Sequence, residues 1–184
     1  AIVKISTPLL GSLFDKVTGT QSLTRLALDD LYSMVESPDS VNKIEAPCLA
    51  AHDCNKKTLQ DVIGHNSMTC LWIDIDDTPY GLGQLAALVE MQGITNAVIY
   101  STASSCRLNN TGGINGKRWR IVIPLLDPIP VSEWVIIQTA LVAMFDGDSS
   151  ALRPAQILFL PNNPEITAPG EIQHYEYQLI EGEL

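Results

Sequence analysis

The chain has 184 residues, 46% of them hydrophobic, which is the composition of a globular protein rather than a disordered one. Its formal net charge of −10 excludes a general electrostatic attraction to nucleic acid. No run of residues approaches the roughly 18 consecutive apolar residues of a membrane helix, so we expect no membrane partner and a cytoplasmic location. The four cysteines suit reduced thiols in that compartment.

The length is that of one domain, and we expect a single domain over residues 1–184. Because the chain begins with Ala1 rather than Met, we expect either a trimmed chain or one domain of a longer protein. Residues 22–36 carry apolar side chains at helical spacing, with Ser22 as the expected N-cap. The stretch 47–64 gives no clear pattern.

Strands and helices alternate through the middle of the chain. The apolar run 70–76 predicts a buried strand, and 82–91 predicts a helix that Gly93 ends. Residues 96–102 predict a second strand. The stretch 104–116 is rich in Ser, Asn and Gly and predicts a long, mobile loop.

The last third repeats this alternation. Residues 119–126 predict a third strand, closed by Asp127-Pro128, and 157–160 predict a further strand. Between them Ser132 is the expected cap of a helix with one apolar face, formed by Trp134, Ile137, Leu141, Met144 and Phe145. This order of elements predicts an α/β or α+β fold.

Three aspartates are the first candidate site. Side chains alternate along a strand, so Asp74 and Asp76 point to the same face. Neighbouring carboxylates repel each other unless a positive charge compensates them, and Mg²⁺ or Mn²⁺ favours such oxygen ligands. Asp148, after a further helix, is a third ligand candidate, and three carboxylates suit two metal ions that promote phosphoryl transfer. The alternative is an ordinary strand end in solvent.

Basic residues are the second candidate. Arg118 and Arg120 share a face of the third strand, and guanidinium groups make bidentate contacts with phosphate oxygens. With Arg107 and Lys117 nearby, a local basic patch on an acidic body is predicted. The alternative is an edge strand whose charges prevent aggregation.

Four segments in one order resemble the archaeo-eukaryotic primase superfamily, the primase-polymerases of phages, plasmids and cellular replication. They are Trp72-Ile-Asp74-Ile-Asp76-Asp77, Val98-Ile-Tyr-Ser101-Thr-Ala103-Ser104, Arg118-Trp-Arg120-Ile-Val-Ile-Pro124-Leu125 and Asp148-Ser-Ser-Ala-Leu-Arg153-Pro-Ala-Gln156-Ile-Leu-Phe-Leu160-Pro161. The resemblance extends over about residues 43–162.

The resemblance implies an RNA-recognition-motif-like catalytic sheet packed with an N-terminal α/β module. It implies a DNA primase or polymerase that joins nucleotides by two-metal chemistry, with Asp74 and Asp76 as the first metal-binding motif and Asp148 as the third. Nucleoside triphosphates and a DNA template and primer are the implied partners. A helicase domain or another replication protein is a further expected partner.

The family's S-x-H motif implies a nucleotide contact at Ser101, and Arg118, Arg120 and Lys43 are implied to lie near phosphates. The histidine of that motif is replaced by Ala103. We therefore expect weakened or absent polymerase activity, either in a diverged member or in an engineered inactive variant.

Two other functions stay open. The run Asp74-Ile-Asp76-Asp77-Thr78 resembles the D-x-D-x-T motif of haloacid-dehalogenase-type phosphatases. Asp74 would then be the nucleophile, Asp76 the general acid/base, Lys117 the phosphate-neutralising lysine, and Asp146 or Asp148 a Mg²⁺ ligand. The other alternative is a non-catalytic replication module that binds nucleic acid, consistent with Ala103.

A zinc site is a separate hypothesis. Its candidate ligands are Cys48, His52, Cys54, His65 and Cys70. Their irregular spacing, and the place of Cys70 in an apolar strand, favour buried thiols and ordinary histidines over a tetrahedral zinc site.

Overall fold

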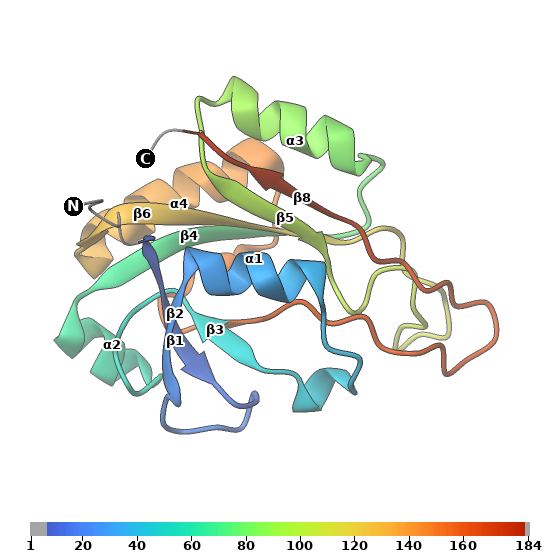
Figure 1. Ribbon diagram of the computed structural model, residues 1–184, viewed down its shortest axis with the longest axis horizontal. Coiled ribbons are helices and arrows are strands. Elements are labelled where there is room, and N and C mark those ends of the chain that lie inside the picture. The colour runs from blue at the N-terminus through green and yellow to red at the C-terminus, as the bar shows by residue number, and fades with distance from the viewer. Residues whose placement is uncertain (1–6, 183–184) are drawn as a thin grey trace, which may run out of the picture.

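The computed structural model describes residues 7–182 as a mixed α+β fold with two four-stranded antiparallel sheets (Figure 1). The first sheet has the order β2-β1-β3-β7, formed by β1 (Leu9–Phe14), β2 (Thr24–Ala27), β3 (Cys48–Ala50) and β7 (Ile157–Phe159). The second has the order β4-β6-β5-β8, formed by β4 (Met68–Ile75), β5 (Ala97–Ser101), β6 (Trp119–Ile129) and β8 (Tyr177–Ile180). The predicted mixed class is confirmed.

The helices are α1 (Leu28–Glu36), α2 (Leu59–His65), α3 (Leu82–Met91) and α4 (Val131–Phe145), with short 3₁₀ turns η1 (Lys43–Glu45) and η2 (Ser149–Leu152). In Figure 1, α4 runs behind the second sheet, and α1 lies in front of it with the first sheet below. One cluster of buried side chains includes residues of both sheets, among them Leu49 and Leu158 of the first and Trp72 and Val98 of the second. The two sheets therefore share one core. No helix among residues 7–182 has the length and apolar character of a membrane span.

Strand register decides which side chains face the first sheet. Asp74 of β4 lies opposite Arg120 of β6, which in turn lies opposite Tyr100 of β5. Arg120 and Tyr100 both donate to the carbonyl oxygen of Phe159 in β7, so this face of the second sheet meets the first sheet. The alternate residues face the helices, because side chains alternate across a strand. Polar side chains of β4, β5 and β6 therefore lie between the two sheets.

Strand β4 lies at the edge of its sheet, where unpaired backbone groups need partners. Helix α4 supplies them. The Gln138 side chain, which is fully buried, donates to the carbonyl oxygens of Trp72 and Ala151 and accepts from the Trp72 N–H. The Trp134 indole N–H donates to the Cys70 carbonyl at 2.8 Å. Side chains of α4 therefore take the place of a neighbouring strand.

Several predicted elements are confirmed and others need correction. The predicted strands at 70–76 and 96–102 and the helix at 82–91 correspond to β4, β5 and α3. The predicted helix at 22–36 is wrong in its first part, because residues 24–27 pair with β1 as strand β2 and the helix begins at Leu28. Ser22 is therefore not its cap. Strand β6 continues through Asp127-Pro128 instead of ending there.

Helix α4 also differs from its prediction. It begins at Val131 with Pro130 as the N-cap, so Ser132 lies in its first turn. Ile137 and Met144, which the sequence pattern assigned to the apolar face of this helix, are 36% and 53% exposed. Gln138 is buried instead, because the edge of β4 needs a hydrogen-bonding side chain. The resemblance to an RNA-recognition-motif sheet stays a prediction.

We predict that Gln138→Leu lowers the free energy of unfolding by about 2–4 kcal/mol, because it leaves buried backbone groups of Trp72 and Ala151 without partners. Urea denaturation followed by circular dichroism measures the change. Gln60→Leu, on an exposed position of α2, is the matched control and should change stability by less than about 0.5 kcal/mol. Equal effects of the two substitutions would contradict the role of Gln138 in covering the edge of β4.

Candidate active site

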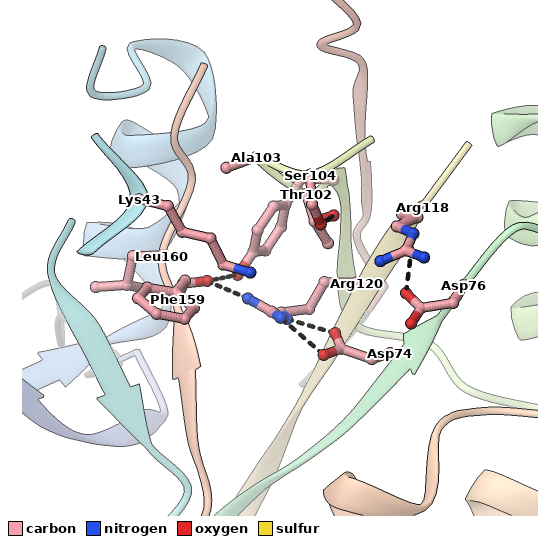
Figure 2. A pocket seen from close by; sticks show the side chains of 11 residues that line it. Lys43, Asp74, Asp76, Thr102, Ala103, Ser104, Arg118, Arg120, Phe159 and Leu160 are labelled. Carbon is pink, nitrogen blue, oxygen red and sulfur yellow. Dashed lines mark hydrogen bonds and ion pairs between the residues drawn. The ribbon is translucent and has the colours of Figure 1, made fainter. Parts of the chain in front are cut away.

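A pocket with a volume of about 110 Å³ lies where the second sheet faces η1 and β7 (Figure 2). We call it the phosphate pocket, after the phosphate contacts that the sequence resemblance implies for Lys43, Arg118 and Arg120. The residues that line it are Lys43, Asp74, Asp76, Tyr100, Thr102, Ala103, Ser104, Arg118, Arg120, Phe159 and Leu160. Three cationic and two anionic side chains thus share one small space.

Asp74 and Arg120 form the innermost ion pair. Arg120 Nε donates to Asp74 Oδ1 at 2.6 Å and Nη2 donates to Oδ2 at 2.8 Å, in a bidentate arrangement that Figure 2 shows. The Arg120 side chain is only 8% exposed. Burial alone would lower the pKa of Arg120, but the charge of Asp74 holds that pKa above its ordinary value. Arg120 therefore stays charged, and both Asp74 oxygens are already bound.

Arg120 also connects the two sheets. Its Nη1 donates to the Phe159 carbonyl oxygen of β7, which accepts a second hydrogen bond from the Tyr100 hydroxyl at 2.8 Å. The guanidinium lies over the Trp72 ring, 5.7 Å from its centroid. The base of the pocket is therefore rigid.

The mouth of the pocket holds a looser pair. Arg118 Nε lies 3.7 Å from Asp76 Oδ1, and Arg118 also makes a bidentate contact with Asp77 through bonds of 3.2 and 2.9 Å. Asp77 adopts a left-handed backbone conformation (φ 50°), an uncommon conformation that Asp tolerates. Burial, with further contributions from Asp74 and Asp148, raises the pKa of Asp76 against the opposing effect of Arg118. The positive charge of Arg118 therefore compensates the negative charge of Asp76 only in part.

Lys43 comes from η1, on the opposite wall. Its Nζ lies 5.2 Å from the centroid of the Phe159 ring. Burial and the nearby Arg120 lower the pKa of Lys43. Thr102 and Ser104 add hydroxyl groups at the end of β5, with Ala103 between them. Lysine, arginine and hydroxyl donors together suit an anion with several oxygens, such as a polyphosphate.

The structure brings the third predicted aspartate next to the first. The backbone N–H of Asp148 donates to the Asp74 carbonyl oxygen at 2.7 Å. Gly147 passes so close to β4 that a Cβ there would lie 2.5 Å from Ile73 Cγ2, so only glycine fits. Asp148 Oδ1 accepts from the Ser150 N–H at 2.7 Å, and hydrogen bonds from Ser150 lower the pKa of Asp148.

Carboxylate oxygens are the ligands that Mg²⁺ and Mn²⁺ prefer, and the undercompensated charge of Asp76 fits a cation there. The arrangement differs from the predicted pair of ions, because both Asp74 oxygens bind Arg120. Within residues 7–182, no group of three or more His, Cys, Asp or Glu side chains is placed to hold a metal ion together, but Mg²⁺ commonly binds through only one or two carboxylates with water and substrate phosphates. These residues therefore fit a divalent ion near Asp76 better than a pair of ions.

Other predicted residues lie elsewhere. Ser101 is fully buried, and its hydroxyl bonds the backbone of residues 174 and 176 instead of facing the pocket. Arg107 binds the Glu171 carboxylate and Lys117 lies 4.0 Å from Glu176, so neither adds to the basic lining. The hydroxyls of Thr102 and Ser104 line the pocket instead. Strand alternation from Tyr100 was the signal for Thr102, but the sequence did not show which face is the inner one.

The candidate zinc ligands do not converge on a common point. His65 Nε2 lies 2.7 Å from Asp53 Oδ1, and the thiols of Cys48 and Cys54 approach backbone carbonyl oxygens. His52 is fully buried, and neither of its ring nitrogens has a hydrogen-bond partner among the described residues. Burial lowers the pKa of His52 to about 4. His52 is therefore a neutral core histidine.

One solved structure has a similar architecture. No family model matches the chain, and no curated protein matches it. Among solved structures, the AEP domain of the primase-polymerase (PrimPol) of cyanophage S-2L is similar, with a TM-score of 0.51 and 16% sequence identity. The alignment covers 88% of this chain and 73% of that chain. At this identity the likeness concerns the fold.

We predict that Arg120→Leu lowers the free energy of unfolding by about 3–5 kcal/mol, because it leaves the Asp74 carboxylate without its partner in a largely buried position. The double substitution Arg120→Leu with Asp74→Leu should recover part of that loss. Arg118→Leu is the control, and its more exposed ion pairs predict a loss of at most about 1 kcal/mol. Urea denaturation measures both losses of unfolding free energy. Similar values for Arg120→Leu and Arg118→Leu would contradict the prediction.

We also predict a pH effect that depends on His52. Its pKa is lower in the folded than in the unfolded protein, so stability is full above about pH 6.5 and is lost as the pH falls toward 4. The loss attributable to His52 between pH 7 and pH 4 is about 2–3 kcal/mol. Urea denaturation at several pH values should show a shallower pH dependence for His52→Phe than for the wild type. The surface variant His65→Gln should keep the steeper dependence, and a wild-type slope in His52→Phe would contradict the prediction.

Proposed function

We propose that this chain is a nucleotidyltransferase domain of the primase-polymerase type, which binds nucleoside triphosphates in the phosphate pocket and joins nucleotides on a DNA template. The observation that carries the proposal is the meeting of Lys43 and Arg118 with Asp76 in that pocket, beside the fixed Asp74–Arg120 pair. The likeness to the cyanophage primase-polymerase domain supports the fold on which such a site is built.

The basic residues would hold the phosphates. Phosphoryl transfer depends mainly on positioning and on stabilisation of negative charge, which Lys43 and Arg118 can supply from opposite walls. Arg120 donates two hydrogen bonds to Asp74 and one to the Phe159 carbonyl oxygen, so its main function would be to hold the base of the pocket in place. The hydroxyls of Thr102 and Ser104 would donate to phosphate oxygens between the cations.

The acidic residues would hold a divalent ion. Asp76 is the first candidate, with Asp148 as its neighbour and Asp74 available only where it shares its oxygens with Arg120. The chemistry supplied by bound Mg²⁺ or Mn²⁺ is neutralisation of phosphate charge and activation of an attacking hydroxyl. Asp76, at 44% exposure, would orient that hydroxyl toward the pocket mouth.

Ala103 lies on the pocket wall where the resembling family has a histidine, and its methyl group makes no polar contact with a phosphate. This position favours a second candidate, a replication module that binds nucleotide or DNA without joining nucleotides. The phosphatase alternative receives less support, because a nucleophilic Asp74 would need an oxygen that Arg120 does not already bind.

The net charge of −10 limits binding of DNA by this domain alone. We therefore propose that a further domain or a replication partner such as a helicase supplies part of the template affinity.

We predict that the purified protein extends a DNA primer slowly with Mn²⁺, and that Ala103→His increases the rate about tenfold, the value of one added hydrogen bond. Asp76→Asn should decrease the rate about 100-fold or more, because it removes the charge that positions the reacting groups. Asp127→Asn, at an exposed position on β6, is the matched control and should leave the rate unchanged.

Gel-based primer extension and de novo priming assays measure these rates. Absence of incorporation by both the wild type and Ala103→His, with DNA still retained, would replace the polymerase proposal by the binding module. Robust hydrolysis of p-nitrophenyl phosphate that Asp74→Asn abolishes would favour the phosphatase.

A further inference from the structure

The phosphate pocket is too small for a whole nucleotide. Its volume is about 110 Å³, whereas pockets that enclose a complete small ligand have roughly 300–1,000 Å³. A triphosphate bound there would therefore leave its base and sugar outside. The base and sugar would then lie against a neighbouring surface of the protein.

Two larger pockets adjoin the phosphate pocket. One, of about 310 Å³, shares only Asp76 with it and has Asp77 and Asp146 among apolar side chains. The other, of about 510 Å³, shares Lys43, Ser104 and Arg118 with it. We call the second one the loop pocket; its residues are Lys43, Asp77, Ser104, Leu108, Asn109, Asn110, Thr111, Asn115 and Arg118. The first of these pockets has three carboxylates and no cation, whereas the loop pocket has Lys43 and Arg118 beside its single carboxylate, Asp77, so a chain of phosphates leads toward the loop pocket.

The loop that forms this pocket is held in a defined shape. Asn109 Oδ1 accepts from the N–H groups of Thr111 and Gly113, both at 3.0 Å. The buried Asn115 donates from Nδ2 to the Ser104 carbonyl oxygen at 2.9 Å. The 104–116 loop predicted to be mobile thus has internal hydrogen bonds that order it.

The same loop is anchored to the C-terminal segment that runs beside it in Figure 1. Arg107, only 8% exposed, donates to the carbonyl oxygens of Glu165 and Pro164 and to the Glu171 carboxylate. The Ile172 N–H donates to the Cys106 carbonyl oxygen at 3.1 Å. The wall of the loop pocket is therefore formed before any ligand arrives.

Two side chains of this wall are available to a ligand. Leu108 is 46% exposed and offers an apolar surface for the face of a base. Asn110 is exposed, and its side chain makes no hydrogen bond to any residue in the described range 7–182. An amide carries both a donor and an acceptor, which matches the paired groups on the edge of a nucleobase.

We propose that the loop pocket holds the base and sugar of the nucleoside triphosphate, with Leu108 against the base and Asn110 at its edge. This inference rests on the proposed function, because it takes the triphosphate to lie in the phosphate pocket. A nucleotide would then bind to the free protein through base contacts, before a template strand is present.

The test compares ATP with inorganic tripolyphosphate, each titrated into the protein with Mg²⁺ by isothermal calorimetry. Leu108→Ala and Asn110→Ala should each weaken ATP binding about 5- to 10-fold, the value of one lost contact, and leave tripolyphosphate binding unchanged. Lys43→Ala should weaken both ligands, because it acts on the phosphates. Leu23→Ala and Asn55→Ala, exposed residues outside both pockets, are the matched controls and should change neither affinity.

The outcomes distinguish a failure of this inference from a failure of the proposed function on which it rests. Tripolyphosphate binding that depends on Lys43, together with ATP binding that ignores Leu108 and Asn110, overturns the inference and leaves the phosphate pocket intact. Loss of ATP affinity in Met144→Ala alone would place the nucleoside in the 310 Å³ pocket that Met144 and Asp146 line, and would also overturn the inference. If neither ligand binds the wild type, the inference and the phosphate pocket both fail.

Discussion

The bidentate contact between Asp74 and Arg120 is the interaction on which the rest of the site depends. It joins β4 to β6 across the sheet, and Arg120 continues to Phe159 on the other sheet. A charged pair in a largely buried position is stable only with all its hydrogen bonds in place, so this contact fixes how the two sheets meet. The pocket is the space that remains at their junction. Its more exposed pair, Arg118 and Asp76, is the looser one, with 3.7 Å between its atoms, whereas the inner pair has hydrogen bonds of 2.6 and 2.8 Å.

The polar half of the site was predictable from strand periodicity. Alternation placed Asp74 with Asp76 and Arg118 with Arg120, and the structure puts all four on the pocket. The same rule does not say which face of a strand is the inner one. At the end of β5, Thr102 lines the pocket and Ser101 does not. That choice depends on pairing with the C-terminal segment, 75 residues away in the chain.

Strands β1, β2 and β3 of the first sheet were not predicted, for a different reason, whereas the strand predicted at 157–160 corresponds to β7. The strands of the first sheet are short, and β3 has only three residues, so no alternation can develop along it. The pairing of β3 with both β1 and β7 satisfies its backbone, and such long-range pairing has no local signature. Gln138 shows the same limit in a helix: a polar residue lies in the core because an edge strand needs it. The predicted elements that correspond to β4, β5, β7 and α3 agree with the structure to within two residues at each end.

The order of residues around the pocket has a consequence for synthesis of the protein. Lys43 comes from the first quarter of the chain and Phe159 from its last fifth, and β3 pairs with β7 across that whole interval. Contacts between distant residues form late and slow the folding of a chain. A nascent chain that stops before residue 157 would lack the strand that completes both the first sheet and the pocket wall. Prematurely terminated products would therefore carry Asp74 and Asp76 without a finished pocket.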